Sequence, residues 1–322
     1  MNMRYFGKEF RTLEYVIENG EHFLLVAHKR PDPDTVGANV AMRGYLESIG
    51  KKATIVCFDP FPEPLRSLFE KTEFYHPDQV NWNEFDAIIA ADSVDRGFHL
   101  LTDRVNENQV VTLIDHHPDI SLTGDVVMID PKYSSSSEIV YLFLNHLQAK
   151  VTRPIATALV TGILFDTGNF QHAIVSPQVM DIASHLMKLG APLAKISNTL
   201  FTNKQISAMK LWGKAFEKAR FVPESGLLVT AVTQYDITEC EATPDDIYQV
   251  ASILSTVPEA KFALVLSERD EETVRGSLRA SEHYGVDVSE IAHKMGGGGH
   301  KMASGFEVKG KIVENELGWS IV

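Results

Sequence analysis

The feature that most constrains the fold is a series of short apolar runs separated by longer polar or helical stretches. The runs are HFLLVAH (22–28), KATIVCF (52–58), FDAIIAAD (85–92), QVVTLIDHH (109–117) and DVVMID (125–130). Each run is continuous rather than alternating, which is typical of strands buried on both faces of a parallel sheet. Helical patterns are found at 36–50, 137–148, 154–165 and 177–189. Together they predict an N-terminal α/β domain, with a doubly wound and mostly parallel sheet, over residues 1–190.

The rest of the chain repeats the α/β pattern on a smaller scale. Residues 191–224 hold two helical stretches without a strand between them, and we interpret this segment as a helical connector. Beyond it, strands are predicted near 225–234, 261–267 and 273–281, and a helix near 288–295. The sequence therefore predicts a second, smaller α/β domain over residues 225–322. A chain of 322 residues is long enough for two separate cores.

The composition argues against a membrane-bound or secreted protein. No apolar stretch approaches the roughly 18 residues that a membrane span needs. Residues 1–20 mix charges into every turn and contain no hydrophobic signal core. Cys57 and Cys240 are the only cysteines, which suits a reducing compartment and excludes a disulfide framework. We expect a cytoplasmic protein with no membrane partner.

The net charge of −13 limits the class of substrate. A protein that grips long nucleic acid usually carries a basic footprint, because each neutralised phosphate needs a lysine or an arginine. This chain has the opposite balance, so a long duplex is not expected as a partner. An anionic substrate would have to be short and be attracted by metal ions and a few arginines.

Several predicted strands end in potential metal ligands. The first is followed by His28, Asp32 and Asp34, the third by Asp92, and the fourth by the triplet 115–117; Asp166 lies just past the predicted helix 154–165. In open α/β sheets, ligands bind outside the carboxyl ends of the strands. The sequence therefore predicts that four separate segments deliver carboxylates and imidazoles to one edge of the sheet.

Such a cluster of carboxylates requires a compensating cation. Aspartates at close range raise one another's pKa and destabilise the fold when they are all ionised. Aspartate and histidine without cysteine favour Mn²⁺ or a related ion over a structural zinc site. A single aspartate after a strand is more often a turn former or a helix cap, and we assign Asp86, Asp95 and Asp130 to that structural role.

The motifs HKRPDPD, AADS, DHH and DTGNF, in this order, resemble those of the DHH phosphoesterase superfamily. The segment GGGGHKMASG (296–305) resembles the DHH-associated C-terminal domain. Within the superfamily, the two-domain length is most similar to the bacterial nanoRNase/pAp phosphatases. These enzymes hydrolyse very short oligoribonucleotides and 3'-phosphoadenosine-5'-phosphate (pAp). The resemblance covers nearly the whole chain.

The resemblance implies a role for each candidate residue. His28 and Asp32 would hold one divalent ion, Asp34, His116 and Asp166 a second, and Asp92 would bridge the two. His117 would face the substrate phosphate as a hydrogen-bond donor or acid, and Asp115 would orient the histidines. A hydroxide bridging the two ions, most plausibly Mn²⁺, would attack the phosphorus.

The second domain offers candidates for substrate binding. In TVRGSLRAS (273–281) the apolar and polar residues alternate strictly, so Arg275 and Arg279 share one face of the strand. The resemblance assigns phosphate binding to Arg279, although the serine usual beside it is replaced by Ala280. Four consecutive glycines exceed what a helix C-terminus needs. We therefore assign Gly297, Gly298, Gly299 and His300 to phosphate binding, with the second domain holding the substrate while the first cleaves it.

The main hypothesis is a two-metal enzyme that cleaves oligoribonucleotides of about two to five nucleotides to mononucleotides and removes the 3'-phosphate of pAp. The alternatives are a linear or cyclic dinucleotide phosphodiesterase and, from another class, a non-catalytic nucleotide-binding regulator. A manganese pyrophosphatase would lack the glycine run, and a RecJ-type exonuclease would need a basic groove. The sequence leaves open a homodimer and the ranking among these substrates.

Overall fold

The computed structural model describes residues 3–118, 120–202, 205–315 and 318–322. The chain divides into two compact units, Met1–Asn203 and Lys204–Val322, and each is described by itself. The segment that we interpreted as a connector contributes to both. It supplies α6 (Leu193–Ser197) and the π-helical turn η6 (Asn198–Thr202) to the first unit, and α7 (Ile206–Glu217) and β6 (Arg220–Val222) to the second.

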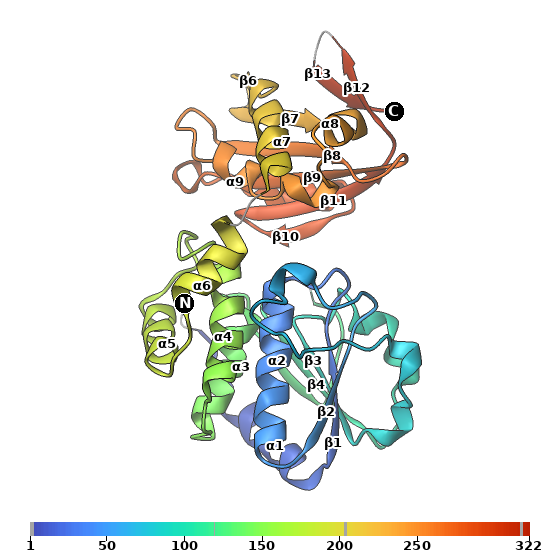
Figure 1. Ribbon diagram of the computed structural model, residues 1–322, viewed down its shortest axis with the longest axis vertical. Helices are drawn as coiled ribbons and strands as arrows, with labels where there is room; N and C mark the ends of the chain where they lie inside the picture. The colour runs from blue at the N-terminus through green and yellow to red at the C-terminus, as the bar shows by residue number, and fades with distance from the viewer. Residues whose placement is uncertain (1–2, 119, 203–204, 316–317) are drawn as a thin grey trace. The chain divides into compact units, whose positions relative to one another are not determined.

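The first unit is built on a five-stranded sheet in the order β2-β1-β3-β4-β5 (Figure 1). Its strands are β1 (His22–Val26), β2 (Lys52–Val56), β3 (Ala87–Ala91), β4 (Val110–Asp115) and β5 (Val126–Ile129). Every neighbouring pair is parallel. The predicted α/β class and the parallel sheet are confirmed, because each continuous apolar run forms a strand. The central strand β3 is buried throughout, and the edge strands β2 and β5 are partly exposed.

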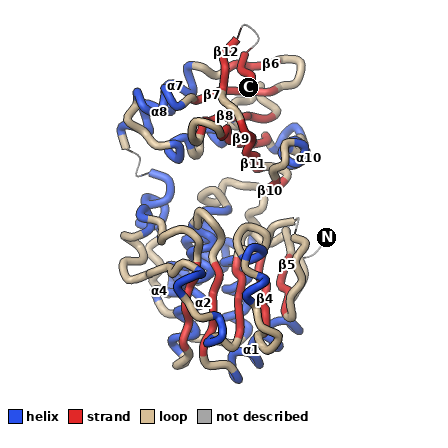
Figure 2. The backbone as a smooth tube through the Cα atoms, turned by 90° about the vertical axis from the view of Figure 1, so that its right-hand side faces the viewer, coloured by secondary structure: helices blue, strands red, loops and turns tan. Residues whose placement is uncertain are grey.

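The α-helices of this unit lie on one face of the sheet. They are α1 (Gly7–Asn19), α2 (Pro33–Ser48), α3 (Ser136–His146), α4 (Arg153–Asp166) and α5 (Pro177–Lys188). The helices α1, α2 and α3 lie against the strands, and α4 and α5 are packed on these helices. Their apolar side chains form one core with Phe23, Leu25 and Ile89 of the sheet. In the tube view the strands of this sheet run side by side with the helices beside them (Figure 2).

The opposite face of the sheet is covered by short 3-10 turns rather than by α-helices. The turn η1 (Glu63–Leu65) packs through Leu65 into the core of the helix face. The turns of the opposite face are η2 (Pro77–Gln79), η3 (Trp82–Glu84), η4 (Phe98–Leu100) and η5 (Thr102–Arg104). Trp82, Phe85 and Phe98 pack there against Leu24 and Ile88 of the sheet. The segment between β2 and β3 carries prolines at 60, 62, 64 and 77. Prolines break a helix interior, which explains why this crossover forms no regular helix.

The second unit has a six-stranded mixed sheet in the order β10-β11-β9-β8-β7-β6. Its further strands are β7 (Leu227–Val232), β8 (Phe262–Glu268), β9 (Thr273–Ala280), β10 (Gly298–His300) and β11 (Ala303–Lys309), and β12 (Ile312–Asn315) pairs with β13 (Gly318–Ile321). Its remaining helical segments are α8 (Gln234–Glu239), η7 (Pro244–Ile247), α9 (Val250–Leu254), η8 (Glu282–Tyr284) and α10 (Val288–Lys294). The predicted smaller α/β domain is confirmed. Among the described residues, no helix is long and apolar enough to cross a membrane.

Candidate metal centre

The parallel sheet of the first unit brings most of the candidate ligands to one edge. His28 lies two residues past β1, Asp92 directly follows β3, and Asp115 is the last residue of β4. Because β3 lies between β1 and β4, Asp92 occupies the middle of this edge. It adopts a left-handed backbone conformation, with φ of 58°, and its N–H donates to Ile114 O at 2.9 Å.

The two aspartates of the first motif belong to the start of α2. The helix begins at Pro33 and has Asp32 as its N-cap, so it starts earlier than the predicted residue 36. Asp32 Oδ1 accepts hydrogen bonds from Asp34 N at 3.0 Å and from Thr35 N at 3.1 Å. Its Oδ2 faces His28 Nε2 at 3.1 Å. One oxygen of Asp32 therefore caps the helix while the other faces the site.

The candidate ligands form two groups that share Asp92, and Asp92 also lies close to Asp115 and His117. In the first group, His28 Nε2 lies 3.1 Å from Asp32 Oδ2 and 3.5 Å from Asp92 Oδ2. In the second group, His116 Nε2 lies 3.0 Å from Asp166 Oδ2, 3.7 Å from Asp92 Oδ1 and 4.0 Å from Asp34 Oδ2. The two oxygens of Asp92 therefore face different groups, as a bridging carboxylate requires.

Unsatisfied buried atoms of the first group fit a bound cation. His28 Nε2 and Asp92 Oδ2 are buried and have no hydrogen-bond partner within the described part of the chain. His28 Nδ1 lies 2.7 Å from Lys29 O. Since a carbonyl only accepts, Nδ1 carries a proton and Nε2 can present a lone pair to the site. A divalent cation would satisfy both buried atoms, so these residues fit a metal ion.

The electrostatics of the cluster lead to the same conclusion. Burial raises the pKa of Asp34 and of Asp166, and in Asp34 the neighbouring carboxylates raise it further. Burial lowers the pKa of the imidazoles, but the carboxylates outweigh it. The pKa of His28 rises to about 9 beside Asp32, and that of His116 rises to about 10 beside Asp166. Without a cation, the cluster holds protons that a metal ion would displace.

The serine run holds the ligands Asp34 and Asp92 in place. Ser135 caps α3, with its Oγ accepting from Glu138 N at 3.0 Å. The next two backbone N–H groups donate to the carboxylate of Asp34, Ser136 N at 2.7 Å and Ser137 N at 3.0 Å. Ser136 Oγ also lies 3.3 Å from Asp92 Oδ1. Sequence reasoning missed this role, because backbone donors have no residue signature.

The space for Asp34 depends on a glycine of α4. A Cβ on Gly162 would collide with Asp34 Oδ1 and Ser137 Oγ. We therefore expect Gly162→Ala to cost about 1–3 kcal/mol of stability and to weaken Mn²⁺ binding by about 10- to 100-fold. Urea unfolding and calorimetric Mn²⁺ titration measure the two effects. The matched control is Gly213→Ala in α7, where a Cβ meets no atom within 4 Å, and equal losses in both variants would contradict this assignment.

Asp115 holds His117 through the ring nitrogen Nδ1. Asp115 Oδ1 accepts from His116 N at 2.8 Å and from His117 N at 3.0 Å, and lies 2.8 Å from His117 Nδ1. Burial opposes ionisation of Asp115, but its contacts to His117 lower its pKa to about 2. The carboxylate is therefore ionised, and Nδ1 of His117 is the donor.

Arg96 contacts this histidine from the other side, and sequence reasoning missed it. Arg96 Nη1 lies 3.3 Å from His117 Nε2, and Arg96 Nη2 lies 3.2 Å from Asp32 Oδ2. A guanidinium only donates, so His117 Nε2 accepts in this arrangement. The resemblance implies a hydrogen-bond donor or acid at His117. In that role, Nε2 would have to give up its contact with Arg96 and face the substrate phosphate instead. The available signal was the arginine in ADSVDR, four residues after Asp92.

Four substrate candidates of the second unit, Arg275, Arg279, Gly298 and His300, share one face of its sheet, whereas Gly299 stands in the row of Leu278. The burial of β9 alternates as predicted, with Val274, Leu278 and Ala280 buried. Arg279 lies opposite Ala303, and Ala303 lies opposite His300, so Arg279 and His300 stand in one row across three strands. Gly298 lies opposite Gly305, and Gly305 lies opposite Ser277, so these three residues form a second row across the same strands. The sheet therefore brings together the basic and glycine candidates that the sequence predicted.

Arg279 has the surroundings of an anion-binding residue. Its Nε donates to Ser252 Oγ at 3.2 Å and its Nη1 to Leu278 O at 2.8 Å. Burial lowers its pKa. No carboxylate within the described residues forms an ion pair with it. Arg275 lies four residues earlier on the same face.

The glycine run has structural requirements of its own. Gly296 and Gly299 have positive φ angles of 76° and 133°, and a Cβ on Gly297 would collide with Gly305 O and Phe306. Gly298 is different, because its φ is ordinary and a Cβ would only touch His293 at 3.6 Å. The fold therefore explains the other three glycines, and Gly298 is the position where a substrate role can be tested.

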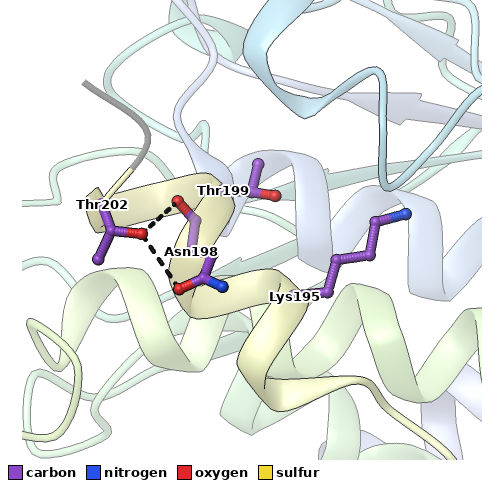
Figure 3. A pocket seen from close by; sticks show the side chains of 4 residues that line it. All are labelled: Lys195, Asn198, Thr199 and Thr202. Carbon is purple, nitrogen blue, oxygen red and sulfur yellow. Dashed lines mark hydrogen bonds between the residues drawn. The ribbon is translucent and has the colours of Figure 1, made fainter. Parts of the chain in front are cut away.

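The first unit also has an open hollow on α6 and η6, lined by Lys195, Asn198, Thr199 and Thr202 (Figure 3). Thr202 Oγ1 donates within it to Asn198 Oδ1 at 3.1 Å, and Lys195 Nζ reaches away to Ser67 O at 2.7 Å. None of its lining residues is a carboxylate or an imidazole, so it is not the metal centre.

Two family models match the chain. The N-terminal domain of the DHH family matches residues 22–163, and the DHHA1 domain matches residues 225–317. A relative from Thermus thermophilus, named bifunctional oligoribonuclease and PAP phosphatase NrnA, is 31% identical over 95% of this chain and 90% of its own length. This chain belongs to the DHH family. The superfamily predicted from HKRPDPD, AADS, DHH and DTGNF is therefore confirmed.

Solved structures with DHH-type folds agree with the architecture. An exopolyphosphatase-related protein from Bacteroides fragilis has a TM-score of 0.85 at 21% identity, covering 94% of this chain and 91% of its own. RecJ from Thermus thermophilus, in a complex with Mn²⁺, has a TM-score of 0.54 at 13% identity, covering 93% of this chain and 51% of its own. At these identities the likeness establishes the fold alone.

Proposed function

We propose that this DHH-family protein is a two-metal phosphohydrolase that cleaves very short oligoribonucleotides to mononucleotides and removes the 3'-phosphate of pAp. The observation that carries the proposal is the pair of acid–imidazole groups sharing Asp92. The 31% identical relative is named for these two activities, which supports this substrate class. We further propose Mn²⁺ as the ion.

Different residues would bind each of the two ions. His28 and Asp32 would hold one ion, Asp34, His116 and Asp166 the other, and Asp92 both. Two such ions, when bound, would neutralise charge on a phosphoryl group and acidify a water molecule. The α3 N-terminus fixes Asp34 through Ser136 N and Ser137 N, so this ligand would need little reordering when an ion binds.

The remaining residues would orient the substrate. Asp115 holds the Nδ1 proton of His117 and thereby directs Nε2 away from the carboxylate toward the site. In the second unit, Arg279 offers a guanidinium that has no carboxylate partner among the described residues, and phosphate matches its fork-shaped donor geometry. We propose Arg279, Arg275, Gly297, Gly298, Gly299 and His300 as the phosphate-binding face.

A hydrolysis panel with added Mn²⁺ tests the proposal. The substrates are pAp, pApA, pGpG, a five-nucleotide RNA, cyclic di-AMP and pyrophosphate. We expect cleavage of pAp and of the short RNAs. Faster cleavage of cyclic di-AMP than of any linear substrate would favour the cyclic dinucleotide alternative. Preference for pyrophosphate would refute the proposal, and inactivity on every nucleotide would favour a binding-only regulator.

Gly298 gives a separate test of the phosphate-binding face. We expect Gly298→Ala to raise the KM for pAp by about tenfold or more, because a methyl group would block close approach of a phosphate to the backbone. Stability should stay within about 0.5 kcal/mol of the parent, since the added Cβ makes only an ordinary contact. Steady-state kinetics and urea unfolding measure both. An unchanged KM would remove Gly298 from the site.

A further inference from the structure

Arg96 lies in the candidate metal centre but has no role in the assignments above. Its backbone is fixed, since Arg96 N donates to Ser93 O at 3.3 Å and Arg96 O accepts from Lys29 N at 3.2 Å. The next residue, Gly97, packs so closely that a Cβ would lie 3.0 Å from His28 Cα. The side chain, in contrast, is 43% exposed. The turn is therefore anchored beside His28 while the guanidinium can be reached from solvent.

The present contacts of this guanidinium are loose. Nη2 lies 3.2 Å from Asp32 Oδ2, and Nη1 lies 3.3 Å from His117 Nε2. Charge-assisted hydrogen bonds of an arginine are normally about 2.7–2.9 Å long and often bidentate. Here one N–H meets a single carboxylate oxygen and another meets a neutral ring nitrogen. Neither contact uses the parallel pair of donors that makes arginine a strong anion ligand.

A phosphate group is a better partner than either of these acceptors. Two phosphate oxygens can accept two parallel N–H groups at once. An incoming phosphate also has to approach an edge that carries Asp32, Asp34, Asp92, Asp115 and Asp166. Two divalent ions offset four of these five negative charges, and one further positive charge beside Asp32 balances the fifth. Arg96 stands at that position.

We propose that Arg96 is a phosphate-binding residue of the hydrolytic centre, and that its guanidinium exchanges Asp32 and His117 for two oxygens of the scissile phosphate. The inference rests on the proposed function. It adds a consequence for His117, whose Nε2 loses its donor when the guanidinium turns to the phosphate. Nε2 then becomes available to the substrate, so phosphate binding and the release of His117 occur together.

The experiment uses Mn²⁺-loaded protein and orthophosphate as the probe. Phosphate affinity is measured by calorimetry and, where the protein is active, as the inhibition constant against pAp hydrolysis. We expect Arg96→Ala to weaken phosphate binding by about 10- to 100-fold, the loss typical of a hydrogen bond to a charged group. Mn²⁺ affinity should change by less than about fivefold, because the contact to Asp32 is partly exposed. Added guanidinium ion should restore part of the phosphate binding, and the same concentration of sodium ion should not.

The matched control is Arg104→Ala. Arg104 lies in the same unit, pairs with the carboxylate of Asp78 and has a similar side-chain exposure of 38%, but it contacts none of the candidate ligands in the described structure. Phosphate and Mn²⁺ affinity should both be unchanged in this variant. If Arg96→Ala does not fold, Arg96→Gln replaces it under the same criteria, since glutamine keeps an N–H for His117 without the charge.

Unchanged phosphate affinity in the Arg96 variant overturns the inference. A loss of Mn²⁺ affinity as large as the loss of phosphate affinity also overturns it, because Arg96 would then only position Asp32. These outcomes are separate from the proposed function, since calorimetry needs no turnover. A parent protein that binds phosphate but hydrolyses no nucleotide refutes the proposed function, and one that hydrolyses pAp while Arg96→Ala keeps its phosphate affinity refutes only the role of Arg96.

Discussion

Asp92→Asn is expected to reduce the hydrolysis of pAp and of short RNA by about a thousandfold or more. Asp92 Oδ2 faces His28 and Asp92 Oδ1 faces His116, so one substitution weakens both groups of ligands. An amide keeps one oxygen but loses the negative charge and replaces the second oxygen with an N–H donor. Since charge stabilisation by a metal ion contributes several kcal/mol in the transition state, losing it corresponds to at least this factor.

Asparagine is the informative substitution because of the backbone at this position. Asp92 has a φ of 58°, a conformation that asparagine tolerates far better than alanine or a branched residue. A loss of activity in Asp92→Asn therefore reports on the carboxylate and not on backbone strain. Circular dichroism and urea unfolding should show a folded protein, and calorimetry should show weakened binding of Mn²⁺.

The matched control is Asp86→Asn at the opposite end of the same strand. Asp86 directly precedes β3, and its Oδ2 accepts from Glu21 N at 2.7 Å and from His22 N at 2.9 Å. This substitution should leave the activity within about twofold, because an exposed turn contact affects stability rather than catalysis. Full activity of Asp92→Asn would contradict a metal-bridging role and favour a protein that only binds nucleotides.

The fold could be predicted where a simple pattern decides it. Five continuous apolar runs became the five parallel strands, and strict alternation in TVRGSLRAS became the alternating burial of β9. The segments that cover the sheet face opposite the α-helices of the first unit could not be predicted in the same way. The prolines at 60, 62, 64 and 77 exclude a regular helix between β2 and β3 but do not specify which turns replace it. Aromatic packing of Trp82 and Phe98 fills that face instead.

The candidate site was predictable as far as side chains at strand ends define it. The carboxyl edge of a parallel sheet collects whatever follows each strand, so the proximity of His28, Asp92 and His116 follows from topology. The contacts of Arg96 were not predictable, because they depend on how the turn after β3 folds back onto His28. The support of Asp34 by two backbone N–H groups was also hidden, since any residue supplies such a donor.

Binding of Mn²⁺ is expected to strengthen as the pH rises from about 6.5 to 8.5, by up to about tenfold per pH unit for each ion. In the metal-free protein the pKa of His28 is about 9 and that of His116 about 10, so both imidazoles are protonated throughout this range. A metal ion requires an unprotonated Nε2, so each ion must displace a proton. Calorimetry in two buffers of different ionisation enthalpy counts the protons released.

The raised pKa values of His28 and His116 also determine how the stability of the metal-free protein varies with pH. A histidine whose pKa is raised by folding contributes stability fully below its unfolded value, about 6.5, and loses this contribution as the pH rises through its folded value. Metal-free protein should therefore lose stability between about pH 6.5 and pH 10, whereas the metal-loaded protein gains affinity over the same interval. The difference between their melting temperatures should grow with pH.

Histidines at the two ends of β1 provide the control. His28→Gln removes one titrating ligand, so one proton fewer should be released when Mn²⁺ binds. His22→Gln, at the start of the same strand, removes a contact to Thr54 Oγ1 at 3.3 Å and the ring packing on Phe85, and should leave the proton count unchanged. A Mn²⁺ affinity that does not vary with pH would show that the imidazoles are not ligands, because a ligand that must first lose a proton cannot bind with equal strength at every pH.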